Sequence, residues 1–494
     1  MKKVLGMVLI LITGLLIVGC DKTPEPTPTP PPTGSGSKPT DVTNVSTFWD
    51  KDGNGIPDWQ EEEITLRYAT WQYTNPDMVT IDVLLIDKFM EKYPNITVEM
   101  QIVGEDYDWD TLFIGLLEAG NLPDVFLVRR LESFLPFKIL ADITELFDND
   151  PDTDYIFESV RNLGVYKNKR YSIPTFIYPY PWFVNLDLLD AAGINKPSYD
   201  WTLEQMEAIA QATTNPTKNE YGLVDASSYV RILPKGLKMK ENLEEGSSWY
   251  AFSYDGDRFN FDDPVMQTGI NRLMQGVEQG YIKRSFSAAE LEEKYNDPAF
   301  VPTYGGKVAI WPEPTWSIKD HFDDFTFEWD AYPGPGGVTG GNTDIAGISA
   351  LSKHKHAAYH LLKWMSFGEE GLLTRFELYK DFGDELYQQA NNFPYPIVDY
   401  GIDGHGVNKV WSSIPYESVA PGFVSPQFIE GLRNGAIWAN KETVGWDAVD
   451  EVIGPYLQEI YRGENTFAAL KETIQQEADR ALNNARRAMD EMLD

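Results

Sequence analysis

A twelve-residue stretch that begins at Asp50 carries oxygen-bearing side chains at the spacing of a calcium-binding loop. The ligands would be the side chains of Asp50, Asp52, Asn54, Asp58 and Glu61 and the main-chain carbonyl of Ile56. Gly55 permits the sharp turn, and hard oxygen donors suit Ca²⁺. Pro57 departs from the helix-flanked form of this loop, so a solvated acidic turn is the alternative. We expect a structural calcium ion over residues 50–62.

The only cysteine, Cys20, stands where a lipid could be attached. Lys2 and Lys3 precede an apolar run of about 15 residues, too short to cross a bilayer and typical of an export signal. Residues 17–20, Ile-Val-Gly-Cys, resemble a bacterial lipobox, whose cysteine is acylated before cleavage. The alternative is an ordinary signal peptide that ends near a stray cysteine. We therefore expect a signal peptide over residues 1–19 and a protein outside the cytoplasm, anchored to the cell membrane by a lipid on Cys20.

Residues 20–49 are rich in proline and threonine, and this composition favours an extended, semi-rigid stalk. The net charge of -35 makes nucleic acid and anionic lipid headgroups poor partners, so the membrane contact is expected through the lipid alone. A chain of 494 residues exceeds what one core usually serves, which indicates two or more lobes.

Strand and helix patterns alternate at the start of the predicted body. Residues 64–71, 96–102 and 124–128 read as strands, and residues 79–92 and 109–118 read as helices. This order predicts an α/β fold with a parallel sheet. Ligands of such sheets lie beyond the carboxyl ends of the strands.

Several motifs, in order, resemble the bacterial extracellular solute-binding proteins of ABC importers, in the group that includes sugar-binding proteins. The motifs lie at residues 89–98, 119–125, 164–174, 185–194, 304–310 with Trp316, 333–337, 347–352 and 357–365. The resemblance implies two hinged α/β lobes with the ligand in the cleft between them. Lobe 1 would comprise residues 63–169 and 325–376, and lobe 2 residues 170–324 and 377–494.

The same resemblance implies a monomer that captures a solute for an ABC permease and is not an enzyme. The aromatic content of 13% favours an oligosaccharide, because aromatic rings stack on sugar faces. The candidate ligand-binding residues are Trp71, Glu105, Asp106, Tyr107, Arg129, Tyr178, Tyr180, Trp311, Trp316, Asn342 and Asp344. By contrast, Trp182, Trp249, Trp364 and Trp438 are expected in the core.

Two other functions stay open at this point. A surface glycoside hydrolase would need two carboxylates across the sugar bond, and the acidic residues are too numerous to single out a pair. A solute sensor could use the same fold. His356 and His360 share a helix face and could bind a metal, but without further ligands a surface helix is the preferred interpretation.

Overall fold

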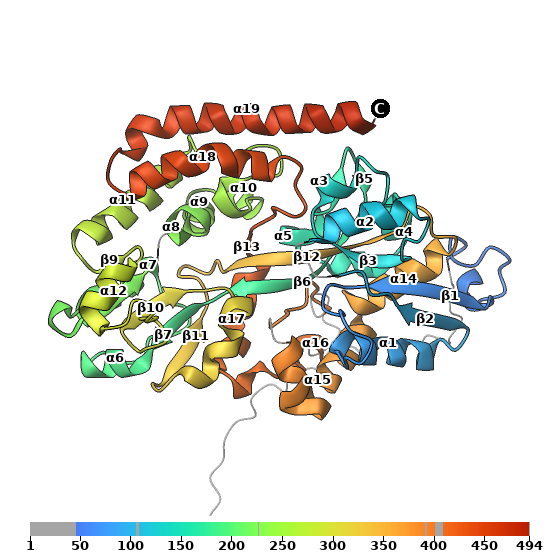
Figure 1. The fold of residues 1–494 in the computed structure, drawn as a ribbon, viewed down its shortest axis with the longest axis horizontal. Coiled ribbons are helices and arrows are strands. Elements are labelled where there is room, and N and C mark those ends of the chain that lie inside the picture. The colour runs from blue at the N-terminus through green and yellow to red at the C-terminus, as the bar shows by residue number, and fades with distance from the viewer. Residues whose placement is uncertain (1–45, 105–107, 226, 391–392, 401–408, 494) are drawn as a thin grey trace, which may run out of the picture. The chain divides into compact units, whose positions relative to one another are not determined.

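Two separate β-sheets organise the chain in the computed structural model (Figure 1). The model describes residues 46–104, 108–225, 227–390, 393–400 and 409–493. The first sheet has the order β13-β12-β3-β1-β2, with β6 paired to β12, and the second has the order β11-β7-β10-β8-β9. A third, two-stranded sheet joins β4 and β5.

The strands of the first sheet are β1 (Ile64–Ala69), β2 (Ile96–Met100), β3 (Val125–Val128), β6 (Ile173–Tyr180), β12 (Gly340–Ile348) and β13 (Ala436–Ile437). Those of the second are β7 (Trp182–Asn185), β8 (Tyr221–Val224), β9 (Ile282–Lys283), β10 (Val308–Pro312) and β11 (Trp329–Tyr332). The small sheet contains β4 (Val165–Tyr166) and β5 (Lys169–Arg170).

The longer helices are α1 (Ile81–Lys92), α2 (Trp109–Glu118), α7 (Leu203–Thr213), α9 (Leu233–Glu241), α11 (Pro264–Glu278), α12 (Ala288–Tyr295), α14 (Lys355–Met365), α15 (Glu369–Ala390), α17 (Pro426–Arg433), α18 (Trp446–Tyr461) and α19 (Phe467–Leu493). The shorter ones are α3 (Leu131–Phe134), α4 (Thr144–Asp148), α5 (Glu158–Arg161), α6 (Leu186–Ala191), α8 (Ser228–Arg231), α10 (Leu243–Ser247), α13 (Thr315–Ile318) and α16 (Lys409–Ser412). No helix in the described part of the chain is long and apolar enough to cross a bilayer.

The predicted parallel sheet is confirmed. β1 pairs in parallel with both β2 and β3, and α1 begins where the Thr80 side chain accepts a hydrogen bond from the N–H of Val83. α1 packs against α14 and α15. Leu66, Leu85 and Val125 are fully buried, so sheet and helices share one apolar core. The carboxyl ends of β1 and β3 therefore point to a single edge of this sheet.

Three strands of the first sheet, β6, β12 and β13, lie where the chain passes between the two sheets, and we call them the linking strands. β6 belongs to the first sheet and β7, two residues later, to the second. β11 falls within the segment predicted for lobe 1, yet it pairs in the second sheet, so the return crossing runs through residues 333–339. β12 then pairs with β6 and with β13. Gly341 is required here, since a Cβ atom would come within 2.8 Å of the Ile177 side chain.

The C-terminal helix α18 contains a proline. It continues through Pro455 to Tyr461. The residue four positions earlier, Glu451, is exposed, so the carbonyl that loses its partner can turn towards water. α19 then packs along α18.

Candidate functional site

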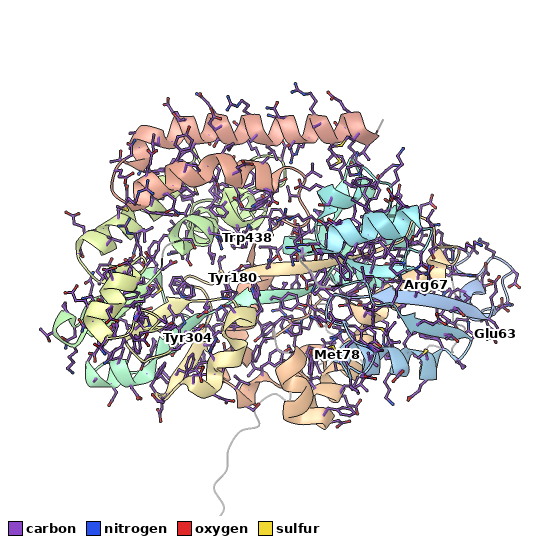
Figure 2. The ribbon with its side chains drawn as sticks, in the orientation of Figure 1. Glu63, Arg67, Met78, Tyr180, Tyr304 and Trp438 are labelled. Carbon is purple, nitrogen blue, oxygen red and sulfur yellow. The ribbon has the colours of Figure 1, made fainter. Side chains whose placement is uncertain are left out.

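Four aromatic residues form a cluster at the linking strands, which we call the aromatic cluster: Tyr178, Tyr180, Trp316 and Trp438. The rings of Tyr180 and Trp316 meet edge to face with centroids 5.2 Å apart, and those of Tyr178 and Trp316 are 6.5 Å apart. Trp316 and Trp438 pack against one apolar group that contains Tyr180. Figure 2 labels Tyr180 on β6 and Trp438 just beyond β13. Segments from both sheets therefore supply one aromatic surface.

Arg231, at the end of α8, lies against this surface. Its guanidinium carbon is 4.3 Å from the ring centroid of Trp438 and 5.2 Å from that of Phe252. Phe252 and Ser253 both have a positive φ, at 56° and 57°. Such strain in non-glycine residues persists only where the surroundings impose it, and it concentrates at functional sites.

A row of unsatisfied polar atoms follows β13. Trp438 Nε1, Asn440 Oδ1 and Glu442 Oε2 are buried and have no hydrogen-bond partner within the part of the chain that the structure describes. Arg231 Nε belongs to the same group. Residues 440–442 form a turn in which the Thr443 N–H donates to the Ala439 carbonyl at 3.1 Å, so one short segment supplies all three unsatisfied atoms. Buried polar atoms without partners are costly, and a ligand rich in hydroxyl groups would satisfy them.

Glu442 is the most buried member of this row, with 3% of its surface exposed. The Thr343 hydroxyl donates a hydrogen bond to its Oε1 atom. Burial raises the pKa of Glu442 to about 7, against the smaller opposing effects of Thr343 and Lys441. The carboxyl is thus held ready either to accept or to donate a hydrogen bond near neutral pH.

Lys441 connects the row to the edge of the first sheet. Its Nζ atom pairs with Asp344 of β12 and lies 5.6 Å from the centre of the Trp71 ring. Trp71 in turn packs edge to face on Trp109 of α2, 5.5 Å away. Two of the predicted ligand-binding residues, Trp71 beyond the end of β1 and Asp344 within β12, therefore meet through Lys441.

A small cavity of about 30 Å³ lies beside Asp344 and Tyr178. Its wall includes an ion pair between Asp82 and Arg375, which are 2.8 Å apart and buried. This volume suits one or two waters and no sugar ring.

The predicted ligand-binding residues divide into four groups, the last of which is Trp311 alone. Trp71, Tyr178, Tyr180, Trp316, Asn342 and Asp344 lie at or beside the linking strands. Arg129 follows β3 and lies near Asp110. Its positive charge lowers the pKa of the Asp110 carboxyl, against the larger effect of burial, which raises it. Glu105, Asp106 and Tyr107 lie outside the described residues.

Trp311 is placed away from the aromatic cluster. It is buried, stacks on Phe183 at 5.5 Å and donates its indole N–H to Glu313 at 3.2 Å. As the strand residue of β10 that packs on β7, it serves the core of the second sheet. Trp182, Trp249 and Trp364 are in the core, as predicted.

Sequence reasoning missed Arg231, Asn440, Lys441 and Glu442. It also placed Trp438 in the core, and this is wrong, because Trp438 is only half-buried whereas Trp182, Trp249 and Trp364 are buried. The available signal was the run of polar residues Asn440, Lys441 and Glu442 shortly after a two-residue strand. That strand, β13, is too short to recognise from its sequence.

The predicted calcium loop folds back on itself around the Asp50 carboxylate, with Gly53 and Gly55 in the left-handed region. The Asp50 carboxylate accepts hydrogen bonds from the N–H groups of Gly53 and Gly55, both at 2.7 Å, and both glycines have a positive φ. The Asn54 amide donates to Asp52 at 3.2 Å and to Glu61 at 2.8 Å. No group of three or more His, Cys, Asp or Glu side chains is close enough to hold a metal within the described ranges. The donor set nevertheless consists of the hard oxygens that calcium requires.

His356 and His360 are not on an open helix surface, and that expectation is wrong. His360 stacks on Trp59 with ring centroids 4.3 Å apart and meets Trp49 edge to face at 4.8 Å. Burial lowers the pKa of His360 to about 3, so the ring is neutral. Trp49, which precedes the calcium-like loop, and Trp59, which lies within it, cover this face of α14, and no helix pattern could reveal this.

Comparison with known proteins identifies the fold. Residues 71–367 match the family model of the bacterial extracellular solute-binding proteins. The arabinooligosaccharide-binding protein of Bacillus subtilis is 23% identical over 305 residues, which cover 58% of this chain and 66% of that protein.

Two solved structures share the architecture. An ABC substrate-binding protein of Listeria monocytogenes in complex with cycloalternan has a TM-score of 0.55 at 18% identity, over 87% of this chain and 100% of that one. A cyclic α-maltosyl-1,6-maltose binding protein of Arthrobacter globiformis has a TM-score of 0.62 at 15% identity, over 86% and 100%. The two sheets joined by linking strands are thus a two-lobed binding-protein fold, and the chain belongs to the bacterial extracellular solute-binding proteins.

Proposed function

We propose that the protein captures an oligosaccharide at the aromatic cluster and delivers it to an ABC importer. The observation that carries this proposal is that buried and half-buried aromatic rings lie at one place with unsatisfied polar atoms. Trp438 combines the two, since its ring is only half-buried and its Nε1 atom has no partner among the described residues. The named sugar ligands of the similar proteins support the same chemistry.

Sugars need both kinds of contact. A pyranose or furanose ring offers a C–H face that stacks on indole or phenol rings, while its hydroxyls need planar polar partners. Asn440, Glu442 and Arg231 supply an amide, a carboxyl and a guanidinium. A site whose buried polar atoms are completed only by hydroxyls rejects ligands that lack them, often by orders of magnitude. Recognition of a hydroxyl-rich ligand follows from this arrangement.

The proposed role is binding without turnover. A hydrolase would need one carboxyl to protonate the leaving oxygen and another to act as base or nucleophile. At this site the Asp344 carboxylate is paired with Lys441, and Glu442 is hydrogen-bonded by Thr343. These partnerships suit ligand positioning better than attack on a glycosidic bond.

A thermal-shift screen tests this function. The protein is heated with arabinooligosaccharides, maltooligosaccharides, amino acids and peptides, because a ligand that binds only the folded state raises the melting temperature. We expect one oligosaccharide class to raise it, and the sugar to be recovered intact by chromatography. A shift only with amino acids or peptides would reject the oligosaccharide, and cleaved sugar would reject pure binding.

The lipid on Cys20 and the calcium ion complete the proposal. A lipid at Cys20 followed by the proline-rich stalk would hold the body at the outer face of the cell membrane. We expect Cys20→Ser to move the protein from the membrane fraction to the medium. The calcium ion would hold the loop through Asp50, Asp52, Asn54, Asp58, Glu61 and the Ile56 carbonyl, the residues that match the spacing.

A further inference from the structure

The last turns of α19 contact the first sheet's side of the protein. The Tyr166 hydroxyl donates to the Asp490 carboxylate at 2.6 Å, and Lys167 Nζ lies 2.7 Å from the same carboxylate. Tyr166 belongs to β4, close in the chain to β1–β3. Met489 is buried in the apolar cluster that also contains Trp109 and Phe126. Polar and apolar contacts together therefore hold the end of α19 against the first sheet's side of the protein.

One turn earlier, the same helix contacts the second sheet's side. Arg486 donates to the Tyr254 hydroxyl at 2.8 Å and to the Asp257 carbonyl at 2.7 Å. Further back, Gln475 donates to the Phe259 carbonyl at 2.8 Å. These partners lie between β8 and β9 in the chain, and the nearby residues 251–253 pack on α8 and α9. Arg486 and Asp490 thus join the two sides across a single helical turn.

α18 makes a second connection of the same kind. At its start, Arg130 pairs with Asp447 at 2.6 Å, and the Gly445 N–H donates to Glu132 at 2.9 Å. Arg130 and Glu132 directly follow β3 of the first sheet. At its other end, Tyr461 lines a groove together with residues of β8 and β9. Figure 1 shows α18 and α19 side by side along the same face.

The contacts of α19 affect how the two lobes can open. In a two-lobed protein, opening rotates one lobe away from the other about the linking strands. β6, β12 and β13 connect the lobes as strands, whereas the α19 contacts connect them through side chains that can separate. Opening must therefore break either the Asp490 contacts or the Arg486 contacts. Neither set includes a residue of the aromatic cluster, so their strength does not depend on ligand contacts.

We propose that the α18–α19 pair is a latch between the lobes, and that the contacts of Asp490 with Tyr166 and Lys167 set the balance between open and closed forms. Its effect on affinity rests on the proposed function, since a ligand held by both lobes gains from a closed form that is already populated. The latch itself operates without ligand.

The test measures the distance between the lobes in the ligand-free protein. Since Cys20 is the only cysteine, the full chain with Cys20→Ser can carry two spin labels, at Glu118→Cys of α2 and Glu244→Cys of α10. Both positions are exposed. The charge reversal Asp490→Lys faces Lys167 and should lengthen and broaden the distance distribution. Glu491→Lys, an exposed position with the same charge change, is the matched control and should leave the distribution unchanged.

A milder variant protects the test against misfolding. Tyr166→Phe removes only the hydroxyl and should shift the distribution in the same direction by a smaller amount. Maltooligosaccharides and arabinooligosaccharides then serve as binding probes, and we expect Asp490→Lys to weaken binding about threefold or more. An unchanged distribution in both Asp490→Lys and Tyr166→Phe would overturn the latch. A shifted distribution without any sugar binding would retain the latch and reject the oligosaccharide proposal instead.

Discussion

The guanidinium of Arg231 lies over the ring of Trp438, with its central carbon 4.3 Å from the ring centroid. The two residues come from opposite sides of the site, because Arg231 ends α8 beside the second sheet and Trp438 follows β13 of the first. A cation over an indole ring is favourable and fixes the orientation of both groups. The pair therefore presents a preformed surface to a ligand.

This pair predicts an effect of changing Arg231. Lysine keeps the charge but loses the planar fork and the stacking, so Arg231→Lys should weaken oligosaccharide binding by about tenfold, equivalent to about 1.4 kcal/mol. Isothermal titration calorimetry measures the change. Arg258→Lys, at a partly exposed arginine paired with Asp262, is the control. Equal losses in both variants would show that the Arg231 stack does not matter.

The buried Glu442 carboxyl is expected to lower the free energy of unfolding at high pH while it favours binding of the sugar. Its folded-state pKa is raised to about 7 from an unfolded value of 4.5, so the folded state holds the proton more tightly. The stability that this proton contributes is complete below about pH 4.5 and is lost as the pH rises through 7. Glu442→Gln is neutral at every pH and should be more stable than the wild type at pH 8, by up to about 3 kcal/mol.

Urea unfolding at pH 4.5 and pH 8 checks this expectation. The two proteins should have similar free energies of unfolding at pH 4.5 and differ at pH 8. The variant should nevertheless bind the sugar more weakly, because the amide does not reproduce the carboxyl. A variant less stable than the wild type at pH 8 would contradict the account of a buried, uncompensated acid.

The calcium loop predicts a metal-dependent melting temperature. Adding Ca²⁺ to chelator-treated protein should raise the melting temperature by a few degrees, through binding to the folded loop alone. Glu61→Gln removes the carboxylate expected to bind in a bidentate manner, and it should abolish this rise. Glu62→Gln, at the adjacent exposed carboxylate, should keep it. An equal response in both variants would place the calcium elsewhere or nowhere.

The buried ion pair below the site predicts a large loss of stability. Asp82→Ala leaves the Arg375 guanidinium buried without its 2.8 Å partner, which should cost about 3–5 kcal/mol. Asp87→Ala, on the exposed face of α1, should cost less than about 0.5 kcal/mol. Chemical denaturation of the two variants compares these values. A small loss in Asp82→Ala would mean that water enters and solvates Arg375.

The sequence predicts the first sheet well, because its strands and helices carry clear periodicities. β1, β2 and β3 with α1 and α2 appear where alternation and helical spacing indicate them. Trp71 can be selected for the same reason, since it follows the end of β1 and strand ends in such sheets face the ligand side. Asp344, in contrast, lies in the middle of β12. Local pattern was sufficient for Trp71.

The second half of the site depends on contacts between distant segments. Trp438 lies 207 positions after Arg231 in the chain, and no local pattern indicates that they stack. Trp311 shows the opposite case, because it lies near the end of β10 like a ligand residue, yet its side chain packs into the core against Phe183. The direction of a side chain on a short strand is set by its neighbours in the sheet, which the sequence alone does not specify.

Trp438 is the residue on which the proposed capture of the sugar depends most, and its replacement is the decisive experiment. Calorimetric titration of Trp438→Ala with the oligosaccharide that stabilises the wild type should show a loss of about 2 kcal/mol or more in binding free energy. Phe137→Ala, at an aromatic residue that is 45% exposed, is the control and should bind as the wild type does. If Trp438→Ala folds and binds the sugar with unchanged affinity, the aromatic cluster is not the binding site.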